Sequence, residues 1–257
     1  MSNVLNTTAL AVGHGKHVLL RDLDLSIAPG QLVCIIGRNG SGKSSLLRTL
    51  CALLPPLSGS VCLGDRPMHE LSALERARRA AIVFAGRTTQ GQVTVFDAVA
   101  MGRHPWTGWT GKLSAEDFSA VSRAMALLGA DGWNDRMLQT LSDGEYQKVM
   151  IARAIAQGTP LLLMDEPTAF LDLTSRVQLM RTLKKIAEEL GKGILLSSHD
   201  LQLALELSDA LLVIGKDGGH WTGTPREAIA QGVISREFDD GDVAFDAARG
   251  AFRPRQK

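Results

Sequence analysis

The sequence lacks the features that mark secreted, membrane-spanning and nucleic-acid-binding proteins. Its three cysteines, Cys34, Cys51 and Cys62, stand in apolar surroundings without metal-ligand spacing. Neither a disulfide framework nor a cysteine metal site is therefore expected, and the thiols are interpreted as buried and reduced. No apolar run approaches the ~18 residues that cross a bilayer. The formal net charge of +1 excludes a broad field that would attract nucleic acid or anionic lipid.

Signals of an exported or repetitive chain are also missing. The N-terminal residues contain no basic stretch followed by a long apolar one, so no signal peptide is expected. There is no internal repeat or low-complexity segment. A chain of 257 residues can bury one substantial core, as a single α/β domain or as a core with an inserted subdomain. We therefore expect a soluble protein of the cytoplasm.

One segment carries most of the chemical information. Residues 37–44 read Gly-Arg-Asn-Gly-Ser-Gly-Lys-Ser and match the phosphate-binding pattern G-x-x-x-x-G-K-[ST]. The segment lies between an apolar strand-like run at 32–36 and a helix start at 45–47. Glycines allow backbone N–H groups to turn inward around phosphates, and the helix N-terminus adds its positive end. Lys43 is expected to reach the β- and γ-phosphates of a nucleotide, and the Ser44 hydroxyl to bind Mg²⁺.

The hydrophobic pattern predicts an α/β fold with a helical insertion. Strand-like runs flank the phosphate loop, at 18–20, 23–27, 60–63 and 81–84. The helix after the loop is expected to end near Leu53, because Pro55 and Pro56 cannot continue it. From about 95 to 157 the pattern is helical, with apolar residues recurring at Phe118, Val121, Met125 and Leu128. Buried-strand runs then return, at 161–164, 194–197 and 210–214. Their helical spacers are typical of a mainly parallel sheet.

A pair of carboxylates, Asp165 and Glu166, follows the apolar run 161–164. Alone, such a pair is common at a solvated strand end or a helix start. Beside a phosphate loop it gains a second interpretation, because Mg²⁺–nucleotide chemistry needs one carboxylate near the metal and another near the attacking water. Upstream, Ser142 and Glu145 form the Ser-x-x-Glu pattern of a capping box, which predicts that a helix begins there.

Five motifs occur in an order that resembles the ATP-binding subunits of ABC transporters. They are the phosphate loop, Leu-Ser-Asp-Gly-Glu at 141–145, Asp-Glu at 165–166, Ala-Phe-Leu-Asp at 169–172 and Ser-His-Asp at 198–200. The resemblance covers nearly the whole chain. It implies an α/β P-loop NTPase with a RecA-like core, a mainly parallel sheet, an inserted helical subdomain and an N-terminal antiparallel β region. The expected single ABC ATPase domain spans 1–257, with the core in about 1–86 and 159–257 and the helical subdomain in about 87–158.

The same resemblance implies a cytoplasmic ATPase that hydrolyses ATP with Mg²⁺ and works as a homodimer. Its expected partners are integral membrane permease subunits and, indirectly, an extracytoplasmic substrate-binding protein, with no nucleic acid. The expected location is peripheral, at the cytoplasmic face of the inner membrane. Residues 94–105 and 199–204 look most like the subgroup that energises import of iron chelates, haem or cobalamin.

The resemblance also implies catalytic roles. Asp165 would hold Mg²⁺ through water, and Glu166 would act as the general base that polarises the attacking water. His199 would contact the γ-phosphate and, with Glu166 and Lys43, complete the catalytic set. Asp172 would communicate between the two subunits.

ATP would lie between two copies of the chain. Ser142 and the Gly144 backbone of one copy would close over the γ-phosphate held by the other copy. The residues assigned to ATP are His14, Gly37, Asn39, Gly40, Ser41, Gly42, Lys43, Ser44, Ser45, Ser142, Gly144 and Asp172, and those assigned to the metal are Ser44 and Asp165.

The chain departs from the family pattern in both halves of the site. Asp143 replaces a glycine and Glu145 a glutamine, and we expect these carboxylates to point outward or to serve as caps. His14 stands where an aromatic residue usually stacks on adenine, so a weaker base contact is expected. Ala85 occupies the position of a glutamine that touches Mg²⁺ and senses the membrane partner, and Thr88 is a candidate substitute. We expect this loss to slow ATP turnover without ending it.

Residues 101–109 combine tryptophans, glycines and a proline in a loop-like segment. Trp106 and Trp109 either cover the edge of the helical block or form a partner-binding surface, where aromatic residues and arginine are favoured anchors.

Three other functions fit parts of the pattern. A soluble ABC ATPase of DNA repair would carry long coiled-coil insertions and basic surfaces, and neither is visible. A regulatory module without catalysis agrees with Ala85 but not with Lys43, Asp165, Glu166 and His199 together. A translation-associated factor would need two cassettes, and this chain has one.

Overall fold

A computed structural model describes residues 2–87, 92–215, 217–247 and 249–255. At its centre lies a six-stranded sheet in the order β11-β10-β4-β9-β8-β7. Neighbours from β10 to β7 run parallel, and β11 joins the edge antiparallel. The strands are β4 (Leu32–Gly37), β7 (Ala80–Val83), β8 (Leu161–Met164), β9 (Gly193–Ser197), β10 (Ala210–Ile214) and β11 (His220–Gly223). The mainly parallel sheet expected from the sequence is confirmed.

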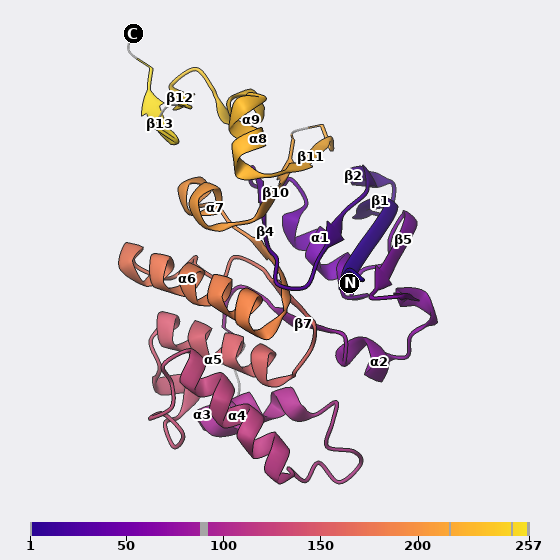
Figure 1. Cartoon of the computed structure of the whole chain (residues 1–257), viewed down its shortest axis with the longest axis vertical. Helices are drawn as coiled ribbons and strands as arrows, with labels where there is room; N and C mark the ends of the chain where they lie inside the picture. Colours follow the sequence, from indigo (N-terminus) through magenta and orange to yellow (C-terminus); the bar gives the residue numbers. More distant parts are fainter. Residues whose placement is uncertain (1, 88–91, 216, 248, 256–257) are drawn as a thin grey trace.

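A second, antiparallel sheet is built from the first part of the chain, in the order β2-β1-β5-β6 with β3 paired to β1. Its strands are β1 (Leu5–His14), β2 (His17–Leu23), β3 (Ser26–Ile27), β5 (Ser58–Leu63) and β6 (Arg66–Pro67). In Figure 1 this sheet stands to the right of the central one, with α1 between them. The N-terminal antiparallel region is thereby confirmed.

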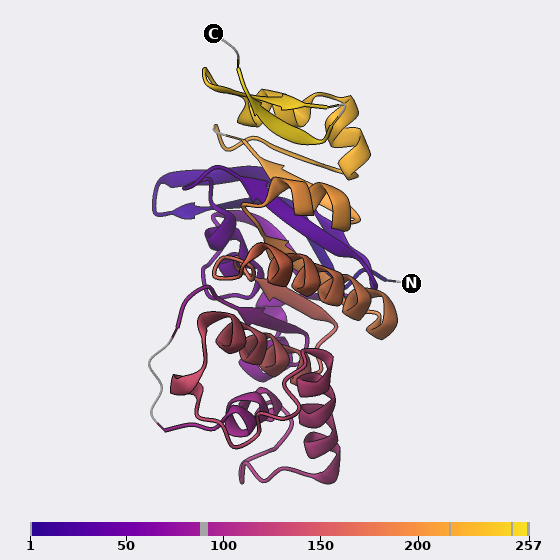
Figure 2. The same cartoon turned by 90° about the vertical axis from the view of Figure 1, so that its left-hand side faces the viewer.

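Helices cover the central sheet and form a block at one end. They are α1 (Lys43–Leu50), α2 (Ala73–Ala77), α3 (Val95–Ala100), α4 (Ala115–Leu127), α5 (Asp143–Ala156), α6 (Leu173–Leu190), α7 (Leu201–Leu207), α8 (Pro225–Ala230) and α9 (Val233–Phe238). Short 3₁₀ turns lie at η1 (Met68–Glu70), η2 (Met101–Arg103) and η3 (Leu138–Thr140). Figures 1 and 2 place α3, α4 and α5 together at the end opposite the C-terminal hairpin of β12 (Val243–Asp246) and β13 (Ala251–Pro254). The residue boundaries of the helical subdomain remain a prediction.

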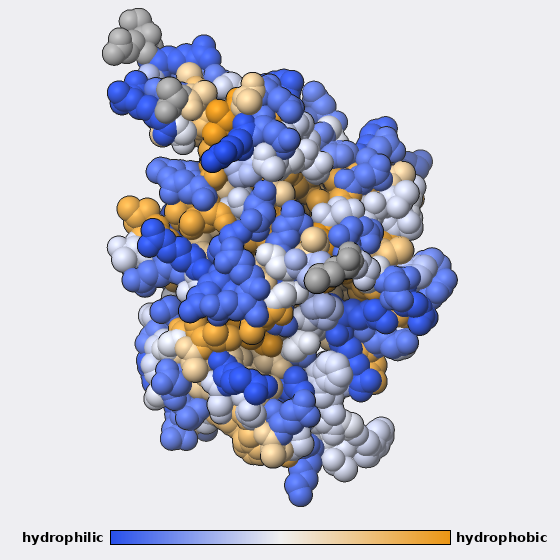
Figure 3. Space-filling model, viewed as in Figure 1, coloured by the Kyte–Doolittle hydropathy of each residue, from blue (hydrophilic) through white to orange (hydrophobic). Residues whose placement is uncertain are grey.

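Two apolar cores meet the two faces of β4, whose six residues are all buried. Cys34 and Ile36 belong to the core shared with α5 and α6, whereas Val33 and Ile35 belong to the core shared with α1 and the N-terminal sheet. This alternation is the period-two pattern of a strand, and burial of both faces explains its continuous apolar run. Hydrophilic residues predominate on the molecular surface in Figure 3, and apolar ones show in patches between them.

All three cysteines are free, but only Cys34 is buried and the other two are half-buried. The expectation of three buried thiols was therefore wrong for Cys51 and Cys62. Burial raises the pKa of the Cys34 thiol to about 12, so this thiol stays protonated and unreactive at neutral pH.

Helix α1 ends earlier than predicted. Ala52 takes the left-handed conformation with φ 62°, and the N–H groups of Leu53 and Leu54 both donate to the Arg48 carbonyl. The helix therefore closes at Leu50, before Pro55 can influence it. This closure could not be predicted because it uses alanine where glycine is the usual choice.

The helical block is stabilised by a buried ion pair. Arg103 of η2 donates from Nε to Oδ1 of Asp117 in α4 at 2.7 Å and from Nη1 to the Ala156 carbonyl at the end of α5 at 2.8 Å. Asp117 also completes the capping box of α4 with Ser114. The amide of Ser114, then the Arg103 guanidinium, lower the pKa of Asp117 to about 2.

We expect Asp117→Ala to lower the free energy of unfolding by about 3–5 kcal/mol, because it leaves the Arg103 guanidinium buried without its partner. The neighbouring exposed change Glu116→Ala should cost less than about 0.5 kcal/mol. Denaturant unfolding at neutral pH measures both. The contribution of Asp117 is present above its unfolded-state pKa of about 4 and is lost as pH falls toward 2, so the difference between wild type and variant should shrink in that window. Equal stability of wild type and Asp117→Ala at pH 7 would contradict a stabilising role for this ion pair.

Candidate functional site

The phosphate-binding loop connects β4 to α1 in the expected strand–loop–helix arrangement. Gly40 and Gly42 take left-handed conformations with φ 78° and 99°. A Cβ atom on Gly37 would lie 2.6 Å from Oγ of Ser41. The loop therefore needs glycine both for its backbone conformation and for the close approach of its own side chain.

The loop presents positive and donor groups that suit a phosphate. Among the described residues, Ser41 Oγ is buried and has no hydrogen-bond partner. Helix α1 has no acidic residue in its first turn, and its N-cap Gly42 makes no side-chain cap. Lys43 is 5% exposed and donates to the carbonyls of Gly37 at 2.9 Å and Arg38 at 3.2 Å. Burial lowers the pKa of Lys43, while Glu166 and Asp165 act in the opposite direction. An anion here would give Ser41 Oγ a partner and would meet the Lys43 ammonium and the N-terminal end of α1.

The carboxylate pair lies where β8 ends, next to the end of β9. Ser197, fully buried, donates from Oγ to Asp165 Oδ1 at 2.8 Å and accepts the N–H of Glu166 at 2.8 Å. One hydroxyl thus orients the first carboxylate and fixes the backbone of the second. Glu166 has φ 48°, an unusual conformation for a non-glycine residue and one that often accompanies function.

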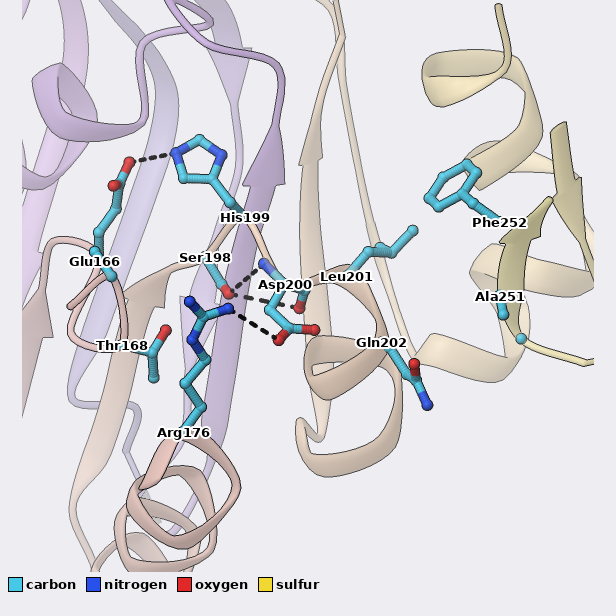
Figure 4. A pocket seen from close by; sticks show the side chains of 12 residues that line it. Glu166, Thr168, Arg176, Ser198, His199, Asp200, Leu201, Gln202, Ala251 and Phe252 are labelled. Atoms are coloured by element: carbon cyan, nitrogen blue, oxygen red, sulfur yellow. Dashed lines mark hydrogen bonds and ion pairs between the residues drawn. The ribbon is translucent and has the colours of Figure 1, made fainter. Parts of the chain in front are cut away.

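His199 and Glu166 meet directly. Nε2 of His199 lies 2.5 Å from Oε1 of Glu166, and Figure 4 shows the two side chains pointing toward each other across the cleft. The cleft has a volume of about 540 Å³. Arg176 and Asp200, which pair at 4.0 Å, also line the cleft, as does Phe252 of β13.

The signature segment 141–145 begins α5 with the predicted capping box. Ser142 Oγ accepts the Glu145 N–H at 3.3 Å and donates to Glu145 Oε2 at 3.0 Å. Arg136 binds Glu145 at 2.8 Å and is the main cause that lowers the pKa of Glu145 to about 2. Asp143 pairs with Arg87 at 2.9 Å. Glu145 is thus a cap, as expected, and each carboxylate has an arginine partner.

The other site residues take separate positions. Asp172 is the N-cap of α6 and accepts the N–H of Ser175 at 2.8 Å, which with the Ser175 hydroxyl lowers the pKa of the Asp172 carboxyl. His14 lies at the end of β1, with Nε2 3.0 Å from Ser45 Oγ. It is therefore beside the phosphate loop, where it is predicted to contact the adenine of a bound nucleotide. Ala85 follows β7 and lines a cleft with Tyr146. Thr88 lies outside the described residues.

The comparisons with known proteins agree with this geometry. A family model described as ABC transporter matches residues 20–169. The chain belongs to the ABC transporter family. It is 35% identical over 97% of its length to an ABC transporter ATP-binding protein of Methanocaldococcus jannaschii, covering 86% of that protein. It is 33% identical over 95% of its length to the iron(3+)-hydroxamate import ATP-binding protein FhuC of Bacillus subtilis, covering 91% of that protein.

A solved structure of an ABC transporter protein has a similar fold. The cbiO1 protein of Clostridium perfringens, described as part of the ABC transporter complex cbiONQ, superposes with a TM-score of 0.79 at 25% identity, over 92% of this chain and 94% of that one. Family membership makes this chain an ATP-binding ATPase subunit. The predicted resemblance and fold are confirmed, while the individual site residues remain predictions.

Sequence reasoning missed three residues around the site. Ser197 carried a signal, since it is the one hydroxyl within the otherwise apolar strand β9 that ends beside the carboxylate pair. Arg87 and Arg136 carried only an indirect one: two extra carboxylates in the signature of an ABC ATPase call for two cations. Arg87 is far from Asp143 in the sequence, and Arg136 lies 9 residues before Glu145 with no regular spacing that predicts a contact, so both pairings needed the fold.

We expect Ser197→Ala to lower kcat for ATP hydrolysis by about ten- to a hundredfold, because Asp165 loses a buried donor and the Glu166 backbone loses its anchor. Binding of ATP without Mg²⁺, which uses the phosphate loop, should change little. The matched control is Thr159→Ala, whose buried hydroxyl donates to the Leu161 carbonyl at 2.8 Å at the opposite end of β8. Steady-state kinetics measure kcat for both variants. If Thr159→Ala loses as much kcat as Ser197→Ala, the positioning role of Ser197 is contradicted.

Proposed function

We propose that this chain is the ATP-hydrolysing subunit of an importer for an iron chelate, haem or cobalamin. Similar proteins support the direction and the cargo: FhuC is named for iron(3+)-hydroxamate import, FpuC of Bacillus anthracis for petrobactin import, and BtuD of Halobacterium salinarum for cobalamin import. The observation that carries the catalytic part is the direct contact between His199 and Glu166, which both line the cleft.

The chain would act together with integral membrane permease subunits, sitting on their cytoplasmic face as a peripheral homodimer. An extracytoplasmic substrate-binding protein would deliver the cargo. Similarity to cbiO1, which is described as part of a transporter complex, supports this arrangement. Among the described residues, every helix is too short or too polar to span a bilayer.

The chain's own residues suit hydrolysis of a nucleoside triphosphate. Lys43 leaves its two carbonyl partners to bind the phosphates, and Ser41 Oγ gains the partner that it lacks among the described residues. Ser44 and Asp165 would hold Mg²⁺, which draws charge from the β- and γ-phosphates when bound. Glu166 takes the proton of the attacking water, and His199, already within reach of Glu166, steadies the γ-phosphate.

The second half of each site would come from another copy. Ser142 and Gly144 stand at the N-terminal end of α5, where backbone N–H groups and the helix dipole favour an anion. A Cβ atom on Gly144 would lie 2.8 Å from Cδ2 of Leu171. A larger residue here would have to displace the end of the Leu171 side chain, so the signature packs closely against the segment that ends at Asp172, which is predicted to communicate between subunits.

A groove between the core and the helical block suits the permease. Two adjoining clefts of about 270 and 310 Å³ share Ile82, Arg153 and Gln157. One includes Ala85 and the other Leu53, which is 62% exposed. Exposed apolar side chains beside arginine are favoured in partner-binding surfaces.

The catalytic test is Glu166→Gln, which should reduce ATP hydrolysis by at least about a hundredfold through loss of the general base. ATP binding should persist, and ATP should hold the variant as a stable dimer in analytical ultracentrifugation. Adding Ser142→Arg should abolish that dimer, and Lys43→Ala should weaken ATP binding itself. Glu189→Gln on the exposed face of α6 is the control. Wild-type turnover in Glu166→Gln would remove Glu166 from the mechanism, and persistent dimers with Ser142→Arg would remove the composite site.

The two tryptophans are expected to differ. The Trp106 ring centre lies 4.9 Å from the Arg78 guanidinium carbon and 5.5 Å from that of Arg103, and its Nε1 donates to the Gln157 carbonyl at 2.7 Å. Trp109 is fully exposed. Trp106→Ser should therefore lower the melting temperature, because cation–π contacts and a hydrogen bond are lost.

Trp109→Ser should leave the melting temperature unchanged and weaken assembly with the permease, as measured by co-purification from membranes. Unchanged assembly with Trp109→Ser would exclude Trp109 as a permease contact.

A further inference from the structure

Arg87 joins the end of β7 to the signature segment by three contacts. Its Nε lies 2.9 Å from Oδ1 of Asp143, Nη2 donates to the Leu141 carbonyl, and the guanidinium lies 5.2 Å from the ring centre of Tyr146. The three partners lie on both sides of Ser142 in the sequence. One side chain from the segment that follows β7 therefore holds the turn that presents Ser142.

The backbone before Arg87 is shaped for this reach. Gly86 has φ 92° and open space around its Cα, so the chain turns sharply after β7 and directs the next side chain toward α5. Ala85 has no polar side chain that could make the link. Among the described residues, Arg87 provides a polar connection between the end of β7 and the start of α5.

The ion pair between Arg87 and Asp143 also compensates negative charge at the start of α5. Asp143 and Glu145 both stand in the first turn of α5, and two unpaired carboxylates there would repel a phosphate approaching the helix N-terminus. Arg136 neutralises Glu145, and Arg87 neutralises Asp143. Without Arg87, the Asp143 carboxylate would lose its ion pair and would add uncompensated negative charge at the helix end that a second copy's phosphate is proposed to approach.

We propose that Arg87 is a positioning residue for ATP-driven closure: it orients Ser142 and cancels the charge of Asp143, so that the signature can accept the nucleotide phosphate of a second copy. This inference rests on the proposed composite site. It explains why the departures at Ala85 and Asp143 occur in one chain, since the arginine close behind Ala85 is the partner of Asp143.

The test uses the full chain in the Glu166→Gln background, with ATP-driven dimerisation as the readout. Arg87→Ala should raise the dimer dissociation constant about tenfold, the loss expected for a charge-assisted contact. Exposed ion pairs add little to stability, so the melting temperature and ATP binding by the monomer should stay near wild type. Lys185→Ala, which breaks the exposed pair with Glu189 on α6, is the matched control and should not change dimerisation.

The decisive variant is Arg87→Ala combined with Asp143→Gly. If Arg87 acts by cancelling Asp143, removing both charges should recover much of the lost dimerisation, and the two changes should be strongly non-additive. Arg87→Gln, which keeps a donor for the Leu141 carbonyl, should fall between wild type and Arg87→Ala.

Additive losses, or dimerisation unchanged in Arg87→Ala, would overturn this inference while leaving the composite site intact. A Glu166→Gln parent that binds ATP but never dimerises would instead overturn the composite site, and this inference with it.

Discussion

The parallel register of β4, β9 and β8 is the constraint on which the rest of the structure depends. Ile35 of β4 pairs with Ser197, and Leu196 pairs with Met164, so the three strands end together at one edge of the sheet. Ligands of open α/β sheets bind outside this carboxyl edge. The phosphate loop, the carboxylate pair and His199 follow the three strand ends and therefore meet there, although more than a hundred residues separate the first from the others. Burial of both faces of β4 protects this register, because a slip by one residue would send every side chain to the wrong core.

The site at this edge is polar yet largely satisfied, which shapes how it can respond to a nucleotide. Ser197 satisfies Asp165 and the Glu166 backbone at once, so the carboxylates keep their places before any ligand arrives. The phosphate loop is different: Lys43 is bonded to two carbonyls of its own loop and Ser41 has no partner among the described residues. A phosphate would replace hydrogen bonds from Lys43 to neutral carbonyls by contacts in which donor and acceptor are both charged. In the proposed mechanism, the rigid half of the site would place the general base, and the adaptable half would bind the nucleotide.

Sequence alone predicted what depends on local pattern. The phosphate loop, the strands 161–164 and 210–214 and the capping box at Ser142 are all encoded within a few residues. What it missed depends on distant partners or on unusual local conformation. Arg87 and Asp143 are far apart in the sequence, and neither segment contains a pattern that predicts their pairing. The early end of α1 follows from the left-handed Ala52. Phe118 fits the helical pattern, yet it is exposed and stacks on Phe96 at 5.7 Å between ring centres.

The N-terminal end of α5 shows how helix stability and anion binding compete for the same groups. The capping box strengthens α5 by engaging Ser142 Oγ and two backbone N–H groups, and acidic residues in a first turn add to that stability. Both effects oppose the binding of a phosphate at this helix end, because donor groups are already occupied and negative charge is already present. Arginine partners remove much of this conflict, because they cancel the charge of the carboxylates and leave the capping hydrogen bonds in place. Glu145 can then continue to cap the helix. To bind a phosphate, the Ser142 hydroxyl would need to release only its hydrogen bonds to Glu145. The departures from the usual signature are therefore compatible with nucleotide binding as a set, and Asp143 and Glu145 have to be interpreted together with Arg87 and Arg136.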